Sequence, residues 1–341
     1  MRLDRFITLN VVKPLRRALV APPASRLASL PVLMYHSISD AAETGVHPYY
    51  RVCTSPGRFR EQMQCLKDHG YQGVTLGAGL ASLNRDATSL FARGADSENG
   101  VAGRPNTQIP TPNSQLSPVV LTFDDGFRDF YTAAGPILRE FGFTATMYLP
   151  TAFIGSKSKI ENRKSKMDAL LPGHYAARRQ FNGRDCLAWN EVRELHGAGI
   201  EFGSHTVNHP KLTEMSWPQI QSEIANSKSE IENHLGAPCP AFAYPYAFPQ
   251  ADREFVARFM DLLKSSGYET NVTTQIGRHH PGGDGLQIKR LPANQADDPP
   301  FLAAKLDGDY DWLGHYQSLS KTLRRGRTVP PQSSKTEKPK L

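Results

Sequence analysis

Two short polar motifs carry the side chains that could do hydrolytic chemistry. A Thr-Phe-Asp-Asp-Gly motif holds two adjacent carboxylates, Asp124 and Asp125, and a Ser-His-Thr-Val-Asn-His motif holds His205 and His209. On one helical turn two imidazoles four residues apart lie about 6 Å from each other and can share a metal ion. An Asp-Gly pair alone is often a turn, and a His pair alone is often structural. Together they offer the three protein ligands of an open catalytic metal site, which leaves other positions for water and substrate.

The spacing of apolar runs indicates how these motifs come together. From residue 31 onward, short apolar runs alternate with helical patterns, which is typical of parallel strands joined by helices. Loops that follow the carboxyl ends of parallel strands converge on one face, so the polar motifs that end two of these runs are expected to meet there. The predicted strands are residues 31–35, 73–76, 119–123, 144–149, 200–203, 241–244, 268–273 and 286–290.

Start and stop signals predict the helices between these strands. Ser55 and Pro56 form an N-cap and first-turn pair, and Gly70 ends the helix that follows them. Similar signals predict helices over residues 217–235 and 252–266. Core packing explains the apolar face of each helix, so no cofactor is needed to account for them.

Four stretches lie outside the alternation and leave residues 31–319 as the predicted barrel. Residues 94–117 are rich in Gly, Pro, Ser, Asn and Thr, which predicts a disordered insertion. Residues 156–184 are polar and basic at their start and favour a lid or substrate loop. Residues 320–341 predict an unstructured basic tail. Residues 1–30 are typical of a basic amphipathic segment, with a frayed or core-docked helix as the alternative.

The net charge of +7 is concentrated at the two ends of the chain. Residues 1–30 carry six Arg/Lys against one Asp, and residues 320–341 carry seven against one Glu, which leaves the middle at −4. A nucleic-acid substrate would require a basic face on the folded part, so the charge pattern argues against one. Basic tails remain compatible with peripheral contact to an anionic membrane surface.

The sequence shows neither a membrane span nor a secretory signal. It has no run of about 18 apolar residues, and charges such as Asp4 and Lys13 interrupt the region where a signal would need an apolar stretch. We therefore expect a cytoplasmic enzyme, with peripheral membrane contact as an option. The four cysteines show no CxxC spacing and are expected to be reduced and structural. They are Cys53, Cys65, Cys186 and Cys239.

The two polar motifs resemble the first and second motifs of the polysaccharide deacetylase family, also called the NodB-homology family. Three further segments agree in order: Leu-Pro-Val-Leu-Met-Tyr-His-Ser-Ile at 30–38, Phe-Ala-Tyr-Pro-Tyr at 242–246 and Lys-Arg-Leu-Pro at 289–292. The resemblance spans roughly residues 30–319. It implies an α/β fold, a distorted (β/α) barrel of about seven repeats.

The resemblance also implies a role for each motif residue. Asp125, His205 and His209 would ligate one divalent metal ion, usually zinc, and Asp124 would be the general base. A metal lowers the pKa of bound water from 15.7 toward about 7, and a nearby carboxylate that does not bind the metal can then accept its proton. Adjacent carboxylates on an extended backbone point to different sides, so one can bind metal while the other does not.

The general acid and the oxyanion donors come from other segments. The leaving amine of an acetamide departs poorly unless it is protonated. Many family members supply the general acid from a Leu-x-His segment near the carboxyl end, and the sequence has no convincing copy there. The Leu-Met-Tyr-His segment resembles that of a subgroup in which the N-terminal His serves instead, so the resemblance implies His36 as the acid; a core histidine that caps the first strand is the alternative. Pro245 and Tyr246 resemble the third family motif, in which the Tyr backbone N–H polarises the acetyl carbonyl.

The sequence departs from the family pattern around the third motif. Ala247 stands where a Gly is usual, and the Arg that often precedes the motif and orients the catalytic Asp is absent. Arg290 is a candidate substitute, although a surface or structural ion pair is the more common role of an isolated arginine.

The expected function is removal of N-acetyl groups from amino sugars in a polysaccharide or glycan precursor. An O-acetyl esterase is the nearest alternative, because the same tetrahedral intermediate serves both reactions. A degenerate carbohydrate-binding barrel and a membrane-associated scaffold are alternatives from other classes. A two-metal phosphohydrolase is disfavoured, because the motifs place only one ligating carboxylate and one His pair.

Overall fold

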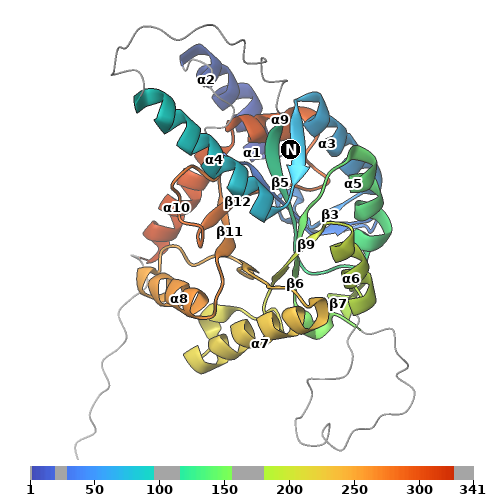
Figure 1. Ribbon diagram of the computed structural model, residues 1–341. Coiled ribbons are helices and arrows are strands. Elements are labelled where there is room, and N and C mark those ends of the chain that lie inside the picture. Colours follow the sequence, from blue (N-terminus) through green and yellow to red (C-terminus); the bar gives the residue numbers. More distant parts are fainter. Residues whose placement is uncertain (1, 20–28, 96–115, 156–179, 326–341) are drawn as a thin grey trace, which may run out of the picture.

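The computed structural model describes residues 2–19, 29–95, 116–155 and 180–325. Eight parallel strands form one sheet, and helices surround it (Figure 1). In sheet order the strands are β1 (Val32–Tyr35), β12 (Ile288–Pro292), β11 (Thr270–Ile276), β10 (Ala241–Ala243), β9 (Glu201–Ser204), β6 (Thr146–Leu149), β5 (Ser117–Phe123) and β4 (Tyr71–Val74). All eight predicted strands are therefore present.

The sheet closes into a barrel of seven strands because β5 also pairs with β1. β4 pairs with the first half of β5, up to Val120, whereas β6 pairs with Thr122 and Phe123 farther along the same strand. β4 therefore lies between the first half of β5 and the residues that precede β6, at the amino end of the barrel. The ring of the other seven strands stays intact. This confirms the expected distorted (β/α) barrel of about seven repeats.

Alternate residues along the strands face two different cores. In β5, Val120 points inward to a small cluster with Val32 and Tyr148, whereas Leu121 and Phe123 point outward. The outward side chains form the larger core, which lies between the barrel and the surrounding helices.

The surrounding helices follow the strands in chain order. They are α3 (Pro56–Asp68), α4 (Leu76–Ala95), α5 (Gly135–Phe141), α6 (Trp189–Gly197), α7 (Trp217–Leu235), α8 (Arg253–Ser265), α9 (Pro299–Asp307) and α10 (Asp311–Arg325). The predicted caps are confirmed: Ser55 Oγ accepts from Arg58 N at 3.2 Å before α3, and Gly236 ends α7 with φ +65°. A short π-turn (Phe130–Ala134) precedes α5.

Shorter elements complete the chain. Before the barrel, α1 (Leu3–Ile7), a π-turn (Thr8–Val12) and α2 (Lys13–Leu19) form one N-terminal helical segment. The remaining strands are β2 (Ser37–Ile38), β3 (Cys53–Thr54), β7 (Gln180–Phe181) and β8 (Arg184–Asp185), and short 3-10 turns cover Pro48–Tyr50, Thr151–Phe153 and Leu212–Glu214. All four cysteines are free and buried, as predicted.

Some predicted boundaries differ from the structure. The second strand ends at Val74 and not at residue 76, because Thr75 Oγ1 accepts from Ala78 N and starts α4. α4 continues to Ala95 and α10 to Arg325, so both helices enter segments predicted to be disordered. The rest of the insertion, the tail beyond residue 325 and most of the 156–184 loop lie outside the described residues. No helix in the described ranges is long and apolar enough to cross a membrane.

Candidate active site

The three predicted metal ligands meet at the carboxyl ends of β5 and β9. Asp125 Oδ1 lies 3.7 Å from His205 Nε2 and 3.4 Å from His209 Nε2, and the two imidazole nitrogens are 3.1 Å apart. One ligand atom from each residue lies within 4.8 Å of the others, and all three side chains are largely buried. The structure therefore brings the predicted cluster together.

The backbone that carries the two histidines is not the helical turn that the sequence suggested. Thr206 and His209 have φ values of +68° and +52°, so the chain folds back on itself after β9. His209 N donates to Thr206 Oγ1 at 3.0 Å, and Glu223 on α7 accepts from the N–H groups of Val207 and Asn208 at 2.8 Å each. This clamped loop holds the two Nε2 atoms 3.1 Å apart.

Strained backbone is concentrated at the site. Four of the five non-glycine residues with positive φ in the described part of the chain belong to it: Asp125, Thr206, His209 and Tyr246. Asp125 has φ +73°, so it does not continue the extended backbone assumed for the two carboxylates. Non-glycine residues rarely adopt the left-handed backbone conformation unless the surrounding structure imposes it. Residues held in this conformation cluster at functional sites.

The donor set fits a divalent metal ion. His205 Nδ1 lies 2.8 Å from the carbonyl of Ala243, which holds the proton on Nδ1 and turns the Nε2 lone pair toward Asp125. Burial lowers the pKa of His205, and it lowers the pKa of His209 to about 3, so both imidazoles are neutral, the form that binds metals. Burial and the neighbouring Asp124 raise the pKa of Asp125 to about 8, a cost that a cation between the three side chains would relieve.

Asp124 is not part of this cluster and is held by Arg290. Arg290 Nη1 and Nη2 donate to the two carboxylate oxygens at 2.7 and 2.8 Å, and its Nε donates to the Thr273 carbonyl at 3.0 Å. Burial alone would raise the pKa of Asp124, but the guanidinium outweighs it and holds that pKa well below its usual range. The surface role weighed for Arg290 is therefore wrong: this arginine is fully buried on β12 and pairs with Asp124, which agrees with the candidate role of a substitute for the missing arginine.

His36 completes the group from the end of β1. Its Nε2 lies 3.9 Å from Asp124 Oδ2, and about a fifth (21%) of its side chain is exposed to solvent. Burial, with Arg290 and His205 nearby, lowers the pKa of His36 to about 4, so the imidazole is neutral at pH 7. His279, which the sequence places near the carboxyl end, lies at the opposite end of the barrel, where its backbone pairs with Leu30 ahead of β1.

The Pro245–Tyr246 segment follows β10 and borders the same cluster. Tyr246 has φ +56°, its ring is 48% exposed, and its ring centroid lies 4.5 Å from that of His209. Pro245 is buried beneath it. The Tyr246 carbonyl accepts from Thr274 Oγ1 at 3.1 Å, whereas its N–H donates to no acceptor within the described ranges of the chain. The predicted oxyanion segment therefore lies beside the metal ligands.

Sequence reasoning missed the function of Glu223 and gave the orienting role of Arg290 only as a candidate. Glu223 stands on the apolar face of α7, three residues after Ile220, and a carboxylate in that position signals a buried polar partner. Arg290 carries a similar signal, because it is a cation inside an otherwise apolar strand that begins at Ile288. Neither signal names the partner, which in each case comes from a distant part of the chain.

Comparison with known proteins agrees with this geometry. The family model for polysaccharide deacetylase matches residues 112–269, which include Asp124, the three metal-ligand candidates and Tyr246. A Bacillus subtilis relative that carries the family's name, YxkH, is 26% identical over 250 residues, which cover 73% of this chain and 66% of YxkH. The poly-beta-1,6-N-acetyl-D-glucosamine N-deacetylase of Escherichia coli is 28% identical over 179 residues, 52% of this chain and 20% of that protein.

A solved structure confirms the fold. The Streptococcus pyogenes deacetylase PplD, solved in complex with acetate, superimposes with a TM-score of 0.57 at 23% identity, over 82% of this chain and 98% of PplD. In its motifs and in the match of the family model over residues 112–269, this chain is similar to the polysaccharide deacetylase family.

Proposed function

We propose that this protein is a metal-dependent hydrolase that removes N-acetyl groups from the amino sugars of a polysaccharide or glycan precursor. The observation that carries the proposal is the juxtaposition of the Asp125, His205 and His209 cluster with the Asp124–Arg290 pair. Similarity to the polysaccharide deacetylase family over residues 112–269 supports the reaction class. The name of the Escherichia coli relative supports an N-acetylated glucosamine polymer as the substrate class.

Asp125, His205 and His209 would hold one divalent metal ion, which we propose to be zinc because one carboxylate and two imidazoles suit it. When bound, such an ion polarises a carbonyl and lowers the pKa of water. The hydrogen bond from His205 to the Ala243 carbonyl and the clamped loop at His209 fix both imidazoles before the ion arrives. Preorganised ligands of this kind avoid reordering the loop on binding.

Asp124 acts as the general base that accepts a proton from the attacking water. Its two bonds to Arg290 keep it ionised and fix its direction, so it cannot rotate toward the ligand cluster. His36, 3.9 Å from Asp124 Oδ2, is placed to deliver a proton to the leaving nitrogen. Because His36 is neutral at pH 7, it has to gain that proton during the reaction, and the adjacent Asp124 is its nearest donor.

Tyr246 supplies the oxyanion contact. Its backbone N–H has no acceptor in the described part of the chain, and its positive φ turns the peptide at the mouth of the site. A fixed N–H of this kind stabilises the negative charge that develops on the acetyl oxygen. Buried Pro245 holds the start of this turn, and its ring fixes the backbone there.

The test is acetate release from N-acetylglucosamine oligomers and from O-acetylated xylan. Untreated, chelated and zinc-reloaded protein are compared with Asp124→Asn and with Asp261→Asn, which changes an exposed carboxylate on α8. We expect metal-restored release from the amino-sugar oligomers, lost only in Asp124→Asn. Release from xylan alone would show an O-acetyl esterase. Glycan binding without release from either substrate would show a degenerate binding barrel.

A further inference from the structure

The N-terminal helical segment carries an unusual concentration of exposed apolar side chains. In the described part of the chain, five of the eleven large apolar residues that are exposed fall within residues 3–19. These five side chains, which we call the apolar stripe, are 43–77% exposed. They are Leu3, Phe6, Val11, Leu15 and Leu19. A surface helix normally turns its apolar face toward the core, whereas this segment turns its apolar face toward the outside.

The π-turn at Thr8–Val12 brings the stripe onto one face. A regular α-helix has 3.6 residues per turn, and the spacing from Leu3 and Phe6 to Val11 and Leu15 does not match whole turns. In such a helix Val11 and Leu15 would therefore be rotated away from Leu3 and Phe6. A π-turn adds a residue to the turn and shifts the helical phase. The residues that it turns inward, such as buried Thr8, contact the barrel, and Thr8 Oγ1 accepts from Trp312 Nε1 at 3.0 Å.

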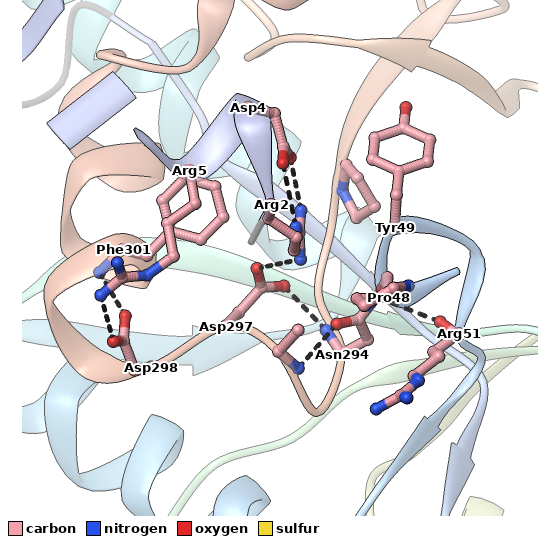
Figure 2. A network of polar contacts seen from close by, with 12 residues as sticks. Arg2, Asp4, Arg5, Pro48, Tyr49, Arg51, Asn294, Asp297, Asp298 and Phe301 are labelled. Carbon is pink, nitrogen blue, oxygen red and sulfur yellow. Dashed lines mark hydrogen bonds and ion pairs between the residues drawn. The ribbon is translucent and has the colours of Figure 1, made fainter. Parts of the chain in front are cut away.

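The polar face of the segment is fixed to the barrel by buried charges. Arg2 donates to Asp297 at 3.0 Å and to Asp4 at 2.6 Å, and its guanidinium lies over the rings of Tyr49 and Phe301 (Figure 2). Asp297 is fully buried and Arg2 is only 7% exposed. Breaking these contacts would remove one of the two cations that pair with buried Asp297, so the segment cannot readily roll over to hide its stripe.

A second tie holds the far end. Arg16 Nη1 donates to Asp309 Oδ1 at 3.1 Å, and Tyr310 donates to Asp4 Oδ2 at 2.7 Å from the same turn between α9 and α10. The segment is therefore held along its length with its polar face inward. Its apolar stripe remains on the outside.

We propose that residues 3–19 seat the protein on an anionic bilayer surface, with the apolar stripe inserted between the lipid headgroups. Lys13 and Arg17 have no carboxylate partner among the described residues, so both cations are free to meet anionic headgroups. An amphipathic helix with cations beside its apolar face binds the interface of anionic membranes. A second copy of the chain would instead bring the same cations together, so charge complementarity favours lipid.

The test is co-sedimentation of the full chain with vesicles of phosphatidylcholine and phosphatidylglycerol. The variant Leu15→Ser/Leu19→Ser replaces two residues of the apolar stripe that are more than half exposed. The matched control, Val46→Ser/Leu116→Ser, replaces two exposed apolar residues elsewhere on the protein. We expect at least a tenfold lower partition coefficient for the stripe variant and an unchanged value for the control. The thermal midpoint of unfolding should not change in either variant, because all four side chains are exposed.

Charge and self-association provide the remaining readouts. Lys13→Gln/Arg17→Gln should weaken binding to the anionic vesicles, and raised salt should weaken wild-type binding in the same direction. Wild-type protein that does not sediment with the vesicles, or equal sedimentation of all variants, would overturn the proposal. So would a lipid-free dimer that Leu15→Ser/Leu19→Ser dissociates, because the stripe would then be covered by a second copy. These measurements do not involve acetate release, so they stand apart from the proposed reaction.

Discussion

At the scale of single residues, the bidentate pair between Arg290 and Asp124 decides how the proposed base is aimed. Lysine keeps the charge but offers a point donor in place of a planar fork, so Arg290→Lys loses the fixed geometry. We expect kcat for acetate release to fall about 10- to 100-fold with KM nearly unchanged, and metal content to stay the same. Arg290→Met should lower kcat further. It should also lower the free energy of unfolding by about 3–5 kcal/mol, because it leaves Asp124 buried and unpaired. Unchanged kcat in Arg290→Lys would refute the positioning role.

The assignment of His36 as general acid makes a separate prediction. His36→Asn should lower kcat on N-acetyl substrates about 100-fold or more, because an amine leaves poorly without a proton. An O-acetyl substrate should suffer less, since an alkoxide is more easily expelled. His279→Asn, at the opposite end of the barrel, is the matched control and should keep near-normal turnover. Near-normal kcat in His36→Asn, measured with metal bound, would remove the acid role.

The ligands could be predicted from the sequence, whereas their orientation could not. Asp125, His205 and His209 belong to short local motifs whose spacing is visible in the chain. The partner of Asp124 is Arg290, 166 residues away, and only closure of the barrel places β1 between β12 and β5 and so brings the two side chains together. Long-range contacts of this kind leave a buried charge in the sequence but do not name its partner.

At the scale of elements, close packing inside β9 makes a prediction about stability. A Cβ at Gly203 would lie 2.6 Å from the ring of buried Tyr148 and 2.8 Å from the Ala241 carbonyl. Gly203→Ala should therefore lower the free energy of unfolding by about 1–3 kcal/mol or more, measured by urea denaturation. Gly197→Ala, in α6 with nothing within 4 Å, is the control and should not destabilise the protein. Equal stability of both variants would contradict the described packing of β9.

Helix boundaries could be predicted where a capping residue marks them in the sequence. They were harder to predict where an apolar run continues from a strand into the next helix. Ser55 begins α3 and Gly236 ends α7, because Ser55 supplies the local hydrogen bond and Gly236 the left-handed backbone that each cap requires. The run at residues 73–76 was placed late because its apolar character continues into α4. The loop of His205 and His209 was taken for a helical turn, because the clamp by Glu223 is a tertiary contact.

At the scale of the whole molecule, a buried ion network ties the N-terminal segment to the barrel (Figure 2). Asp297 accepts from Lys305 at 2.9 Å and from Arg2 at 3.0 Å, and Lys305 is fully buried with a pKa lowered by burial. Asp297→Asn should cost about 3–5 kcal/mol in the free energy of unfolding. Asp298→Asn is the neighbouring control: its pair with Arg5 is partly exposed, and Asn preserves the cap of α9, so its cost should stay below about 1 kcal/mol. Similar losses in urea denaturation would contradict a special role for the buried network.

The central claim is that one metal ion at Asp125, His205 and His209 makes this barrel a deacetylase. The most direct test is a zinc titration of chelated protein, with acetate release from N-acetylglucosamine oligomers followed against equivalents of metal. We predict that release rises to a break at about one equivalent, and that Asp124→Asn binds the same equivalent without releasing acetate. Full activity in the chelated protein, or no release after one equivalent is bound, would contradict the account.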